Sequence, residues 1–150
     1  MTTVRGCDLP DDLLYDVENN IWYRENDDGT VTLGMTTVAA AMAGQLVAFT
    51  PKKVGRSVAA GKSCATIESG KWVGPAKTAF DAEVVEVNDA LVADPKSGSG
   101  DSYGTGWLAK VRPADWAAAK AALIPGTAVA GPYEAKMAAD NFAGCAALAA

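Results

Sequence analysis

The stretch SCATIESGKWVGP, residues 63–75, contains the turn on which the prediction of the fold depends. Its first part, SCATIES, is typical of a short β-strand. A clearer strand, AFDAEVVEVND at residues 79–89, follows it and is rich in β-branched valine. Between these runs, Glu68-Ser69-Gly70-Lys71 has the position of a tight hairpin that would hold Lys71 away from the protein body. An exposed lysine in a turn is usually only a solvated charge, so this stretch alone assigns no function.

The sequence on both sides of this turn predicts a mainly β fold. IWYRENDDGTVTLGM, residues 21–35, predicts a hairpin around Asp28-Gly29, because that dipeptide favours a two-residue turn. Val38 to Ala43 predicts a short helix. Further strands are expected at QLVAFTP, around Val58, and from Gly106 to Arg112 before Pro113.

The two ends of the chain differ in composition from the middle. Residues 1–19 are acidic and turn-prone, and we expect an N-terminal extension that packs on the body through its few apolar side chains. After Pro113, ADWAAAKAAL predicts a helix capped by Asp115, because alanine is the best helix former. A second helix is expected to end near Gly144. The predicted parts are therefore 1–19, a β domain at 20–113, and a helical segment at 114–150.

Composition excludes several classes of function. The chain has 150 residues, 49% of them hydrophobic, which is enough for one core. A net charge of −5 argues against nucleic-acid binding, since phosphate recognition needs clustered Lys and Arg. The absence of histidine excludes imidazole catalysis and histidine metal ligation, and we expect no metal site. The acidic start predicts no secretion signal, and no stretch has the length of a membrane span.

Three cysteines, Cys7, Cys64 and Cys145, stand at wide spacing. An odd number at this spacing fits neither a disulfide framework nor a paired-cysteine zinc site, which favours a reducing cytoplasm. Cys64 lies in a β-like run and is expected in the core. For Cys7 and Cys145 two interpretations stay open, a redox role or a packing role as small hydrophobic side chains, and we favour packing.

A phosphate-binding loop is a weaker alternative. Gly61-Lys62-Ser63 invites this interpretation, but five residues separate Gly55 from Gly61 where the motif needs four, and no helical pattern follows.

Six motifs carry a resemblance to a known family. They are IWYR, DGTVTLGMT, the G-x-x-V-x-x-G spacing of residues 55–61, IESGK, AEVVEVNDAL followed by DP, and YGTGWLAKV. In this order the stretch from Trp22 to Pro113 resembles the H-protein family of lipoyl carriers. The resemblance implies a lipoyl-type barrel-sandwich hybrid (hammerhead) of β-strands with short flanking helices at the N-terminal side and C-terminus. It also implies a non-catalytic carrier subunit with lipoate attached covalently to Lys71.

The residues around Lys71 take their expected roles from this resemblance. Glu68, Ser69, Gly70 and Trp72 are expected to guide the attaching ligase or to form the environment of the lipoyl arm, with a plain turn or packing role as the alternative. The five-membered ring of lipoate forces its disulfide torsion far below the preferred range, so thiolates open it readily. Biotin attachment is less favoured, because biotin sites usually have Met beside the lysine.

Departures from the usual H-protein pattern indicate a subgroup. Asn20 and Ile21 precede Trp22 where the family usually has histidine and glutamate, and Ala82 replaces a glycine. Together with RGCDLPDDLLYDVENNIWYR at residues 5–24 and NFAGC at 141–145, these departures resemble the H-protein-like lipoate-binding proteins of bacterial sulfur oxidation.

The first hypothesis is therefore a lipoyl carrier that shuttles sulfur intermediates or electrons to a heterodisulfide-reductase-like complex. Its expected partners are a lipoate ligase or lipoyl transferase and a dihydrolipoamide dehydrogenase, with Cys7 and Cys145 as possible redox partners of the lipoate. The alternatives are a glycine cleavage carrier of the aminomethyl group, working with the glycine cleavage enzymes, and an unmodified interaction module. We expect a cytoplasmic monomer without nucleic-acid or membrane partners.

Overall fold

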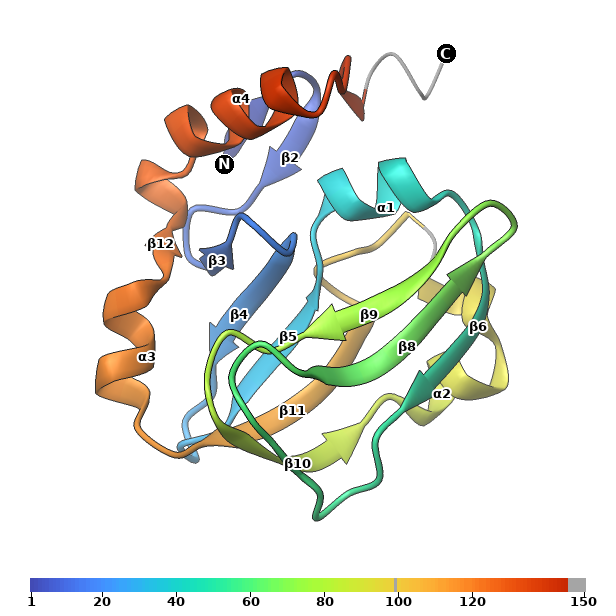
Figure 1. Ribbon diagram of the computed structural model, residues 1–150, viewed down its shortest axis with the longest axis vertical. Coiled ribbons are helices and arrows are strands. Elements are labelled where there is room, and N and C mark those ends of the chain that lie inside the picture. Colours follow the sequence, from blue (N-terminus) through green and yellow to red (C-terminus); the bar gives the residue numbers. More distant parts are fainter. Residues whose placement is uncertain (99, 146–150) are drawn as a thin grey trace.

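The computed structural model describes residues 1–98 and 100–145 and shows a mainly β protein with short helices (Figure 1). The strands are β1 Thr2–Val4, β2 Cys7–Leu9, β3 Leu14–Asp16, β4 Ile21–Glu25, β5 Val31–Met35, β6 Leu46–Pro51, β7 Ser57–Val58, β8 Ser63–Ser69, β9 Val73–Lys77, β10 Ala82–Val87, β11 Trp107–Pro113 and β12 Ile124–Pro125. The helices are α1 Thr37–Ala43, α2 Asp89–Ala93, α3 Trp116–Ala122 and α4 Ala130–Ala139, with 3₁₀ turns at Pro95–Gly98 and Gly126–Ala128. The predicted fold class is confirmed.

The strands form three antiparallel sheets. The largest has the order β12-β3-β4-β5-β11-β10-β7, the second β6-β8-β9, and the third is the β1–β2 hairpin. The predicted β4–β5 hairpin is confirmed, and Asp28 stabilises its turn by accepting a hydrogen bond from the Thr30 amide. Helix α1 begins after Thr36, whose hydroxyl accepts a hydrogen bond from the Ala39 amide. Asp115 caps α3 as predicted.

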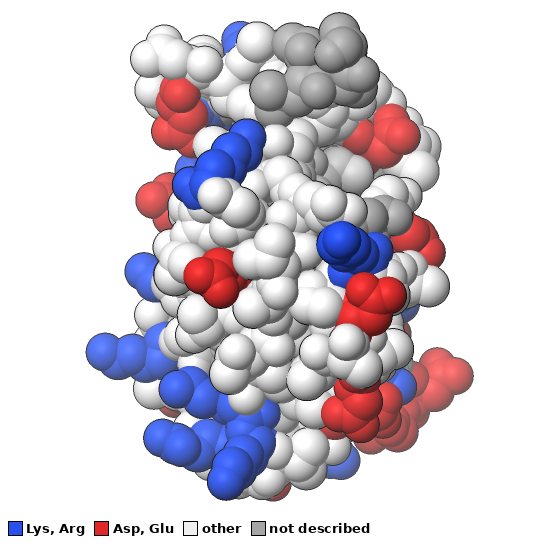
Figure 2. All heavy atoms as spheres, turned by 90° about the vertical axis from the view of Figure 1, so that its right-hand side faces the viewer, with Lys and Arg blue, Asp and Glu red and all other residues white. Residues whose placement is uncertain are grey.

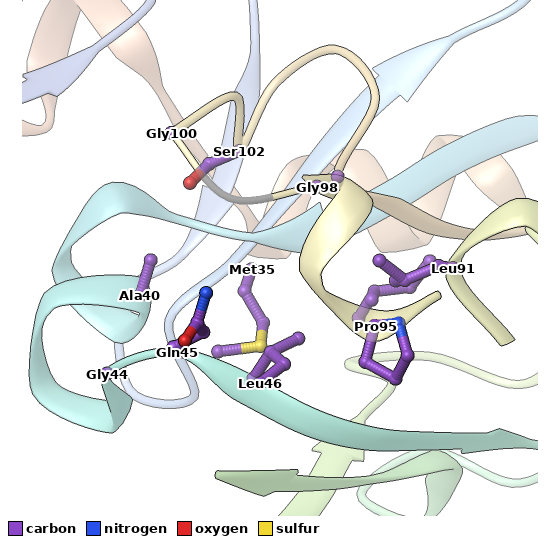
Figure 3. A pocket seen from close by; sticks show the side chains of 12 residues that line it. Met35, Ala40, Gly44, Gln45, Leu46, Leu91, Pro95, Gly98, Gly100 and Ser102 are labelled. Carbon is purple, nitrogen blue, oxygen red and sulfur yellow. The ribbon is translucent and has the colours of Figure 1, made fainter. Parts of the chain in front are cut away.

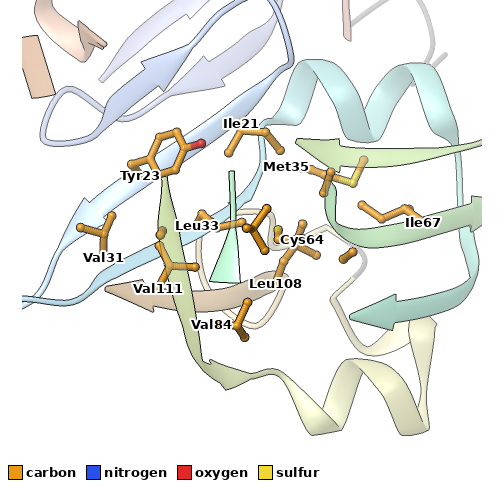
Figure 4. Close-up of a cluster of buried hydrophobic side chains, with 14 of the residues drawn as sticks. Ile21, Tyr23, Val31, Leu33, Met35, Cys64, Ile67, Val84, Leu108 and Val111 are labelled. Atoms are coloured by element: carbon orange, nitrogen blue, oxygen red, sulfur yellow. The ribbon is translucent and has the colours of Figure 1, made fainter. Parts of the chain in front are cut away.

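A first hydrophobic core lies between the seven-stranded sheet and the β6-β8-β9 sheet (Figure 4). Leu33, Ile67, Val84 and Leu108 meet there from four strands, each at most 1% exposed. Alternation along β8 places Ile67 inside and Glu68 outside, as the period of two along a strand requires. The alternation along β8 therefore decides which side chains next to the Lys71 turn face the core and which face solvent.

Cys64 belongs to this core, as predicted. It is a free thiol, and burial raises its pKa to about 11. Because thiolate is the reactive form, we expect Cys64 to resist alkylation at pH 8 in the folded protein and to react after unfolding in guanidinium. Peptide mapping with N-ethylmaleimide checks this, and rapid labelling of folded Cys64 would contradict it.

A second core, here called the terminal cluster, joins the two ends of the chain. Its buried members are Val4, Cys7, Leu9, Leu13, Tyr15, Trp22, Val38, Val129, Tyr133, Met137 and Phe142. Strand β12 pairs with β3, and α4 lies beside β1 and β2 (Figure 1). Segments outside residues 20–113 thus contribute strands to the same sheet as the middle of the chain.

The prediction that the cysteines form no disulfide is wrong. Cys7 and Cys145 are bonded to one another across a sequence separation of 138 residues. Folding brings the ends together, because the amide of Cys145 donates to the carbonyl of Arg5, and the Arg5 guanidinium bonds to Glu134 and to the carbonyl of Phe142. Sequence spacing carries no sign of this proximity.

Two further differences concern helices. The second C-terminal helix was expected to end near Gly144, but α4 ends at Ala139. Gly144 has φ +124° and lies against the Arg5 carbonyl, so it serves the contact between the ends instead of a helix. Helix α2, which Asn88 caps, was not predicted. Residues 146–150 of the predicted helical segment lie outside the described residues.

Across the described part, no helix is long and apolar enough to cross a membrane.

Candidate functional site

Lys71 stands at the tip of the hairpin between β8 and β9. Glu68 pairs with Val73, and the Ser69 amide donates a 2.7 Å hydrogen bond to the Trp72 carbonyl, which closes the turn. Gly70 and Lys71 lie outside the ladder and are exposed. The predicted turn and the exposure of Lys71 are confirmed. The second strand of the hairpin is β9, which was not predicted, whereas the run at residues 79–89 forms β10 in the largest sheet.

Ser69 shapes this turn from inside. Its side chain is buried, and its hydroxyl lies 3.3 Å from the Trp72 carbonyl and 3.4 Å from the Lys71 amide. Glu68 is exposed on the opposite face of β8. Ser69 therefore fixes the backbone while Glu68 offers a charge to an approaching protein. Their role in guiding a ligase stays a prediction.

The Lys71 side chain lies along the C-terminal end of α1. A Cβ atom built on Gly44 would be 3.4 Å from Cε and 4.0 Å from Nζ of Lys71. Gly44 has φ +79°, a left-handed conformation that favours glycine, and its amide ends α1 by donating to the Ala40 carbonyl. One glycine thus ends the helix and lies within van der Waals range of the end of the lysine side chain.

Trp72 turns to the other side of the hairpin. Its indole lies over Gly74, where an added Cβ would overlap the ring, and 41% of the residue is exposed. It also lines an apolar pocket of about 280 Å³ together with Ile21, Met42 and Ala43. Trp72 is therefore a wall of a pocket and, at the same time, part of the exposed surface beside Lys71.

A second pocket of about 300 Å³ opens beside the same end of α1 (Figure 3). Gly44, Gln45 and Leu46 form one wall and Leu91 and Pro95 the other, and Met35 lines both pockets. Lys71 lines neither pocket, but its Cε and Nζ lie near Gly44 of this pocket, and its neighbour Trp72 lines the other pocket.

The surface on the side of the hairpin tip and α2 carries separate charges of both signs among uncharged residues in its upper half (Figure 2). Basic side chains gather at the lower end of this face, and acidic ones lie toward its other edge (Figure 2). No cluster of three or more His, Cys, Asp or Glu that could hold a metal is found among residues 1–98 and 100–145. The chemistry of the site therefore depends on one amine and its apolar surroundings.

The other predicted site residues lie elsewhere. Cys7 and Cys145 are at the beginning of α1, where the Cys145 sulfur is 3.6 Å from the Thr37 carbonyl oxygen. Sequence reasoning missed Gly44, Gly74 and the pocket residue Met35. The only local signals are a glycine after a short alanine-rich helix and a glycine two residues after Trp72.

Comparisons with known proteins agree with this geometry. A family model described as "Glycine cleavage H-protein" matches residues 13–135. Glycine cleavage system H protein 5 of Aquifex aeolicus is 55% identical over 128 residues, which cover 83% of this chain and 86% of that protein. Probable glycine cleavage system H protein 2 of Sulfurisphaera tokodaii is 38% identical over 114 residues, covering 75% and 77%.

A solved structure supports the same assignment. The crystal structure of a glycine cleavage system H protein from Mycobacterium marinum superposes with a TM-score of 0.72 at 32% identity, and the match covers 87% of this chain and 99% of that one. The family match spans most of the chain and includes the hairpin that carries Lys71. This chain belongs to the glycine cleavage H-protein family.

Proposed function

We propose that Lys71 carries lipoate through an amide bond to its Nζ, and that the protein is a non-catalytic carrier serving the glycine cleavage enzymes. H-proteins are carrier subunits that bear lipoate covalently on a lysine. The observation that carries the proposal is the exposed position of Lys71 at the β8–β9 tip, with its side chain along Gly44 between two apolar pockets.

The residues around Lys71 fit a lipoyl group. Amide formation removes the lysine charge, so the modified side chain is uncharged and apolar on both sides of the amide group. The lysine side chain runs beside Gly44, and no salt bridge to Lys71 is found in the described structure. When bound, lipoate supplies a disulfide that exchanges readily with thiols.

The two pockets give the carrier a protected state. Burial of apolar surface contributes about 25 cal/mol per Å², so an apolar arm gains from leaving water. Trp72 and Met42 line one pocket and Leu46 and Leu91 the other, and Gly44, which lies beside the end of the lysine side chain, lines the second. The protein thus holds the arm between visits, and the partner enzymes supply the catalysis.

Intact mass and peptide mapping test the attachment site. After coexpression with a lipoate ligase or lipoyl transferase, we expect a lipoyl-sized increment on the peptide with Lys71. Lys71→Arg should lose the increment completely, because the guanidinium forms no such amide. Lys77→Arg is the matched control, since Lys77 is also exposed and lies at the end of β9. A lipoyl group elsewhere, or on none of the lysines, would contradict the proposal.

The sequence alone placed sulfur oxidation before glycine cleavage, and the family match and the curated relatives favour glycine cleavage instead. One observation keeps the first hypothesis as a second candidate. An aminomethyl group carries an amine that is protonated near neutral pH, and the residues lining the pocket beside Trp72 include no charged side chain. Asn19 and Asn20 also line this pocket, so an ammonium would find a neutral acceptor in the unpartnered Asn20 Oδ1 but no carboxylate to balance its charge, whereas a sulfur cargo needs neither.

Partner assays separate the two candidates. The lipoylated protein is offered glycine and glycine decarboxylase in one reaction, and a heterodisulfide-reductase-like complex in another. Exchange of labelled carbon dioxide into glycine supports the glycine cleavage proposal. Electron uptake by the reductase complex, without that exchange, supports the sulfur-oxidation candidate.

A further inference from the structure

We propose that the Cys7–Cys145 disulfide is a second redox site, which the reduced lipoyl arm of the same molecule opens by thiol–disulfide exchange. The proposal rests on the assignment of lipoate to Lys71. The starting observation is that the disulfide and the lysine side chain contact opposite ends of one short helix, α1. The substrate of this site is a dithiol.

Helix α1 provides a direct path between the two groups. At the start of α1, the Cys145 sulfur lies 3.6 Å from the carbonyl oxygen of Thr37, the first residue of the helix. At its other end, Lys71 lies beside Gly44, the residue that follows the last residue of the helix. Thr37, Ala41 and Gly44 are spaced i, i+4 and i+7, so they follow one face of the helix. Ala41 packs at the edge of the terminal cluster together with Cys145. The middle of this path carries only a methyl group.

The length of the path matches the reach of the arm. Seven residue steps from Thr37 to Gly44 span roughly 10 Å along a helix axis at 1.5 Å per residue. Seven bonds separate Nζ from the nearer sulfur of an attached lipoyl group, and extended single bonds give a reach of roughly 9 Å. The second sulfur adds to this reach. An arm laid along α1 therefore comes to the Cys145 sulfur without unfolding of the protein.

The two cysteines have unequal access. Cys7 is fully buried in the terminal cluster, whereas Cys145 is partly exposed, so an attacking thiolate meets the Cys145 sulfur. A bond forms to Cys145 Sγ, the Cys7–Cys145 bond breaks, and Cys7 leaves as a thiolate that takes up a proton. The second thiol of the dithiol then displaces Cys145, which leaves with the other proton. Two electrons pass from the dithiol to the two cysteines, and the dithiol closes to its ring disulfide.

Exchange would change the contact between the ends of the chain. The disulfide fastens the segment after α4 to β2, next to the Arg5 contacts with Glu134 and Phe142. Those polar contacts remain when the disulfide opens, so the fold persists while the covalent tie is lost. The two cysteines then hold the two electrons that the arm gave up, and the oxidised arm can be reduced again by two further electrons from dihydrolipoamide dehydrogenase and NADH.

Alkylation mapping tests the exchange without relying on the activity of a partner complex. Lipoylated protein at about 10 µM receives dihydrolipoamide dehydrogenase and NADH, and samples are quenched with N-ethylmaleimide. The control is unlipoylated protein with the same enzyme and an equal amount of free dihydrolipoamide. Because a tethered group acts at an effective concentration of order mM, we expect Cys7 and Cys145 to be labelled about a hundredfold faster in the lipoylated protein. Cys64 is buried, so its continued resistance to N-ethylmaleimide shows that the protein stays folded during the experiment.

A pair of variants tests the path. Ala41→Arg places a long side chain on the face of α1 between the two groups and should reduce labelling to the rate of the untethered control. Ala121→Arg, on the exposed face of α3, is the matched control and should label like the parent protein.

The outcomes separate this inference from the proposed function. Labelling of both arm thiols while Cys7 and Cys145 stay bonded would overturn the inference alone, as would equal rates with tethered and free dithiol. Absence of lipoate from Lys71 in the intact mass would overturn the proposed function and this inference with it.

Discussion

A chain in which Gly70 and Lys71 exchange places, Gly70→Lys with Lys71→Gly, will receive lipoate about a hundredfold more slowly than the parent chain, although its turn still contains an exposed lysine. The turn is fixed by the 2.7 Å hydrogen bond from the Ser69 amide to the Trp72 carbonyl, so each position in it has its own direction. The lysine at 71 lies along Gly44, whereas a side chain built at 70 meets no other atom within 4 Å. The amine of the exchanged lysine therefore projects from a different point on the surface than the Lys71 amine does.

The size of this effect follows from the geometry of amide formation. A misplacement of about 1 Å between reacting groups can lower a rate about a hundredfold, and a one-residue shift in a tight turn moves the amine farther than that. Timed intact-mass measurements with a purified ligase give the two rates. Gly70→Ala, which keeps Lys71 in place and has open space for its methyl group, is the control and should be modified like the parent protein. Modification of the exchanged chain at the parent rate would contradict the prediction, because it would show that the ligase requires an exposed lysine in the turn but not its position at residue 71.

The turn at Lys71 could be predicted from sequence, although its second strand β9, which contains Gly74 and Pro75, could not. The signals of the turn are local, because a β-like run leads directly into Gly-Lys, and alternation along β8 follows from its register. The same holds for the β4–β5 turn at Asp28-Gly29 and for the Asp115 cap. The resemblance added the identity of the group on Lys71, which no local pattern contains.

The surroundings of Lys71 could not be predicted in this way. Gly44 is 27 positions before Lys71 in the chain, and it meets the lysine only because α1 ends near the tip of the β8–β9 hairpin (Figure 1). Met35, from β5, lines both pockets for the same reason. The Cys7–Cys145 disulfide is the extreme case, since pairing of β3 with β12 and packing of α4 on β1 bring its two halves together. Such contacts depend on packing between elements that are distant in the chain, and the spacing of residues in the sequence does not indicate which distant elements pack together.

The terminal cluster contains a residue that is both a local sequence signal and a packing contact between distant elements. Trp22 begins the motif that carries the family resemblance, and the structure buries its side chain completely in the cluster that joins the ends. Its indole N–H donates a 3.0 Å hydrogen bond to the Ser102 carbonyl, and the Arg24 guanidinium lies 4.8 Å from the ring centroid. Gly34 faces the ring, where any Cβ would collide with it. A residue recognised as a sequence marker is therefore also a main support of the fold near α1.

Trp22→Ala will lower the free energy of unfolding by about 4 kcal/mol, because truncation of a fully buried aromatic side chain leaves a cavity and costs about 3–5 kcal/mol. The Ser102 carbonyl also loses its donor. Urea unfolding followed by far-ultraviolet circular dichroism measures the change as a shift of the midpoint at constant slope. Trp72→Ala is the matched control, since it removes the same side chain from a position that is 41% exposed, and it should cost less than about 1 kcal/mol. Equal losses in the two variants would contradict the assignment of Trp22 as the support and Trp72 as a surface wall of the arm site.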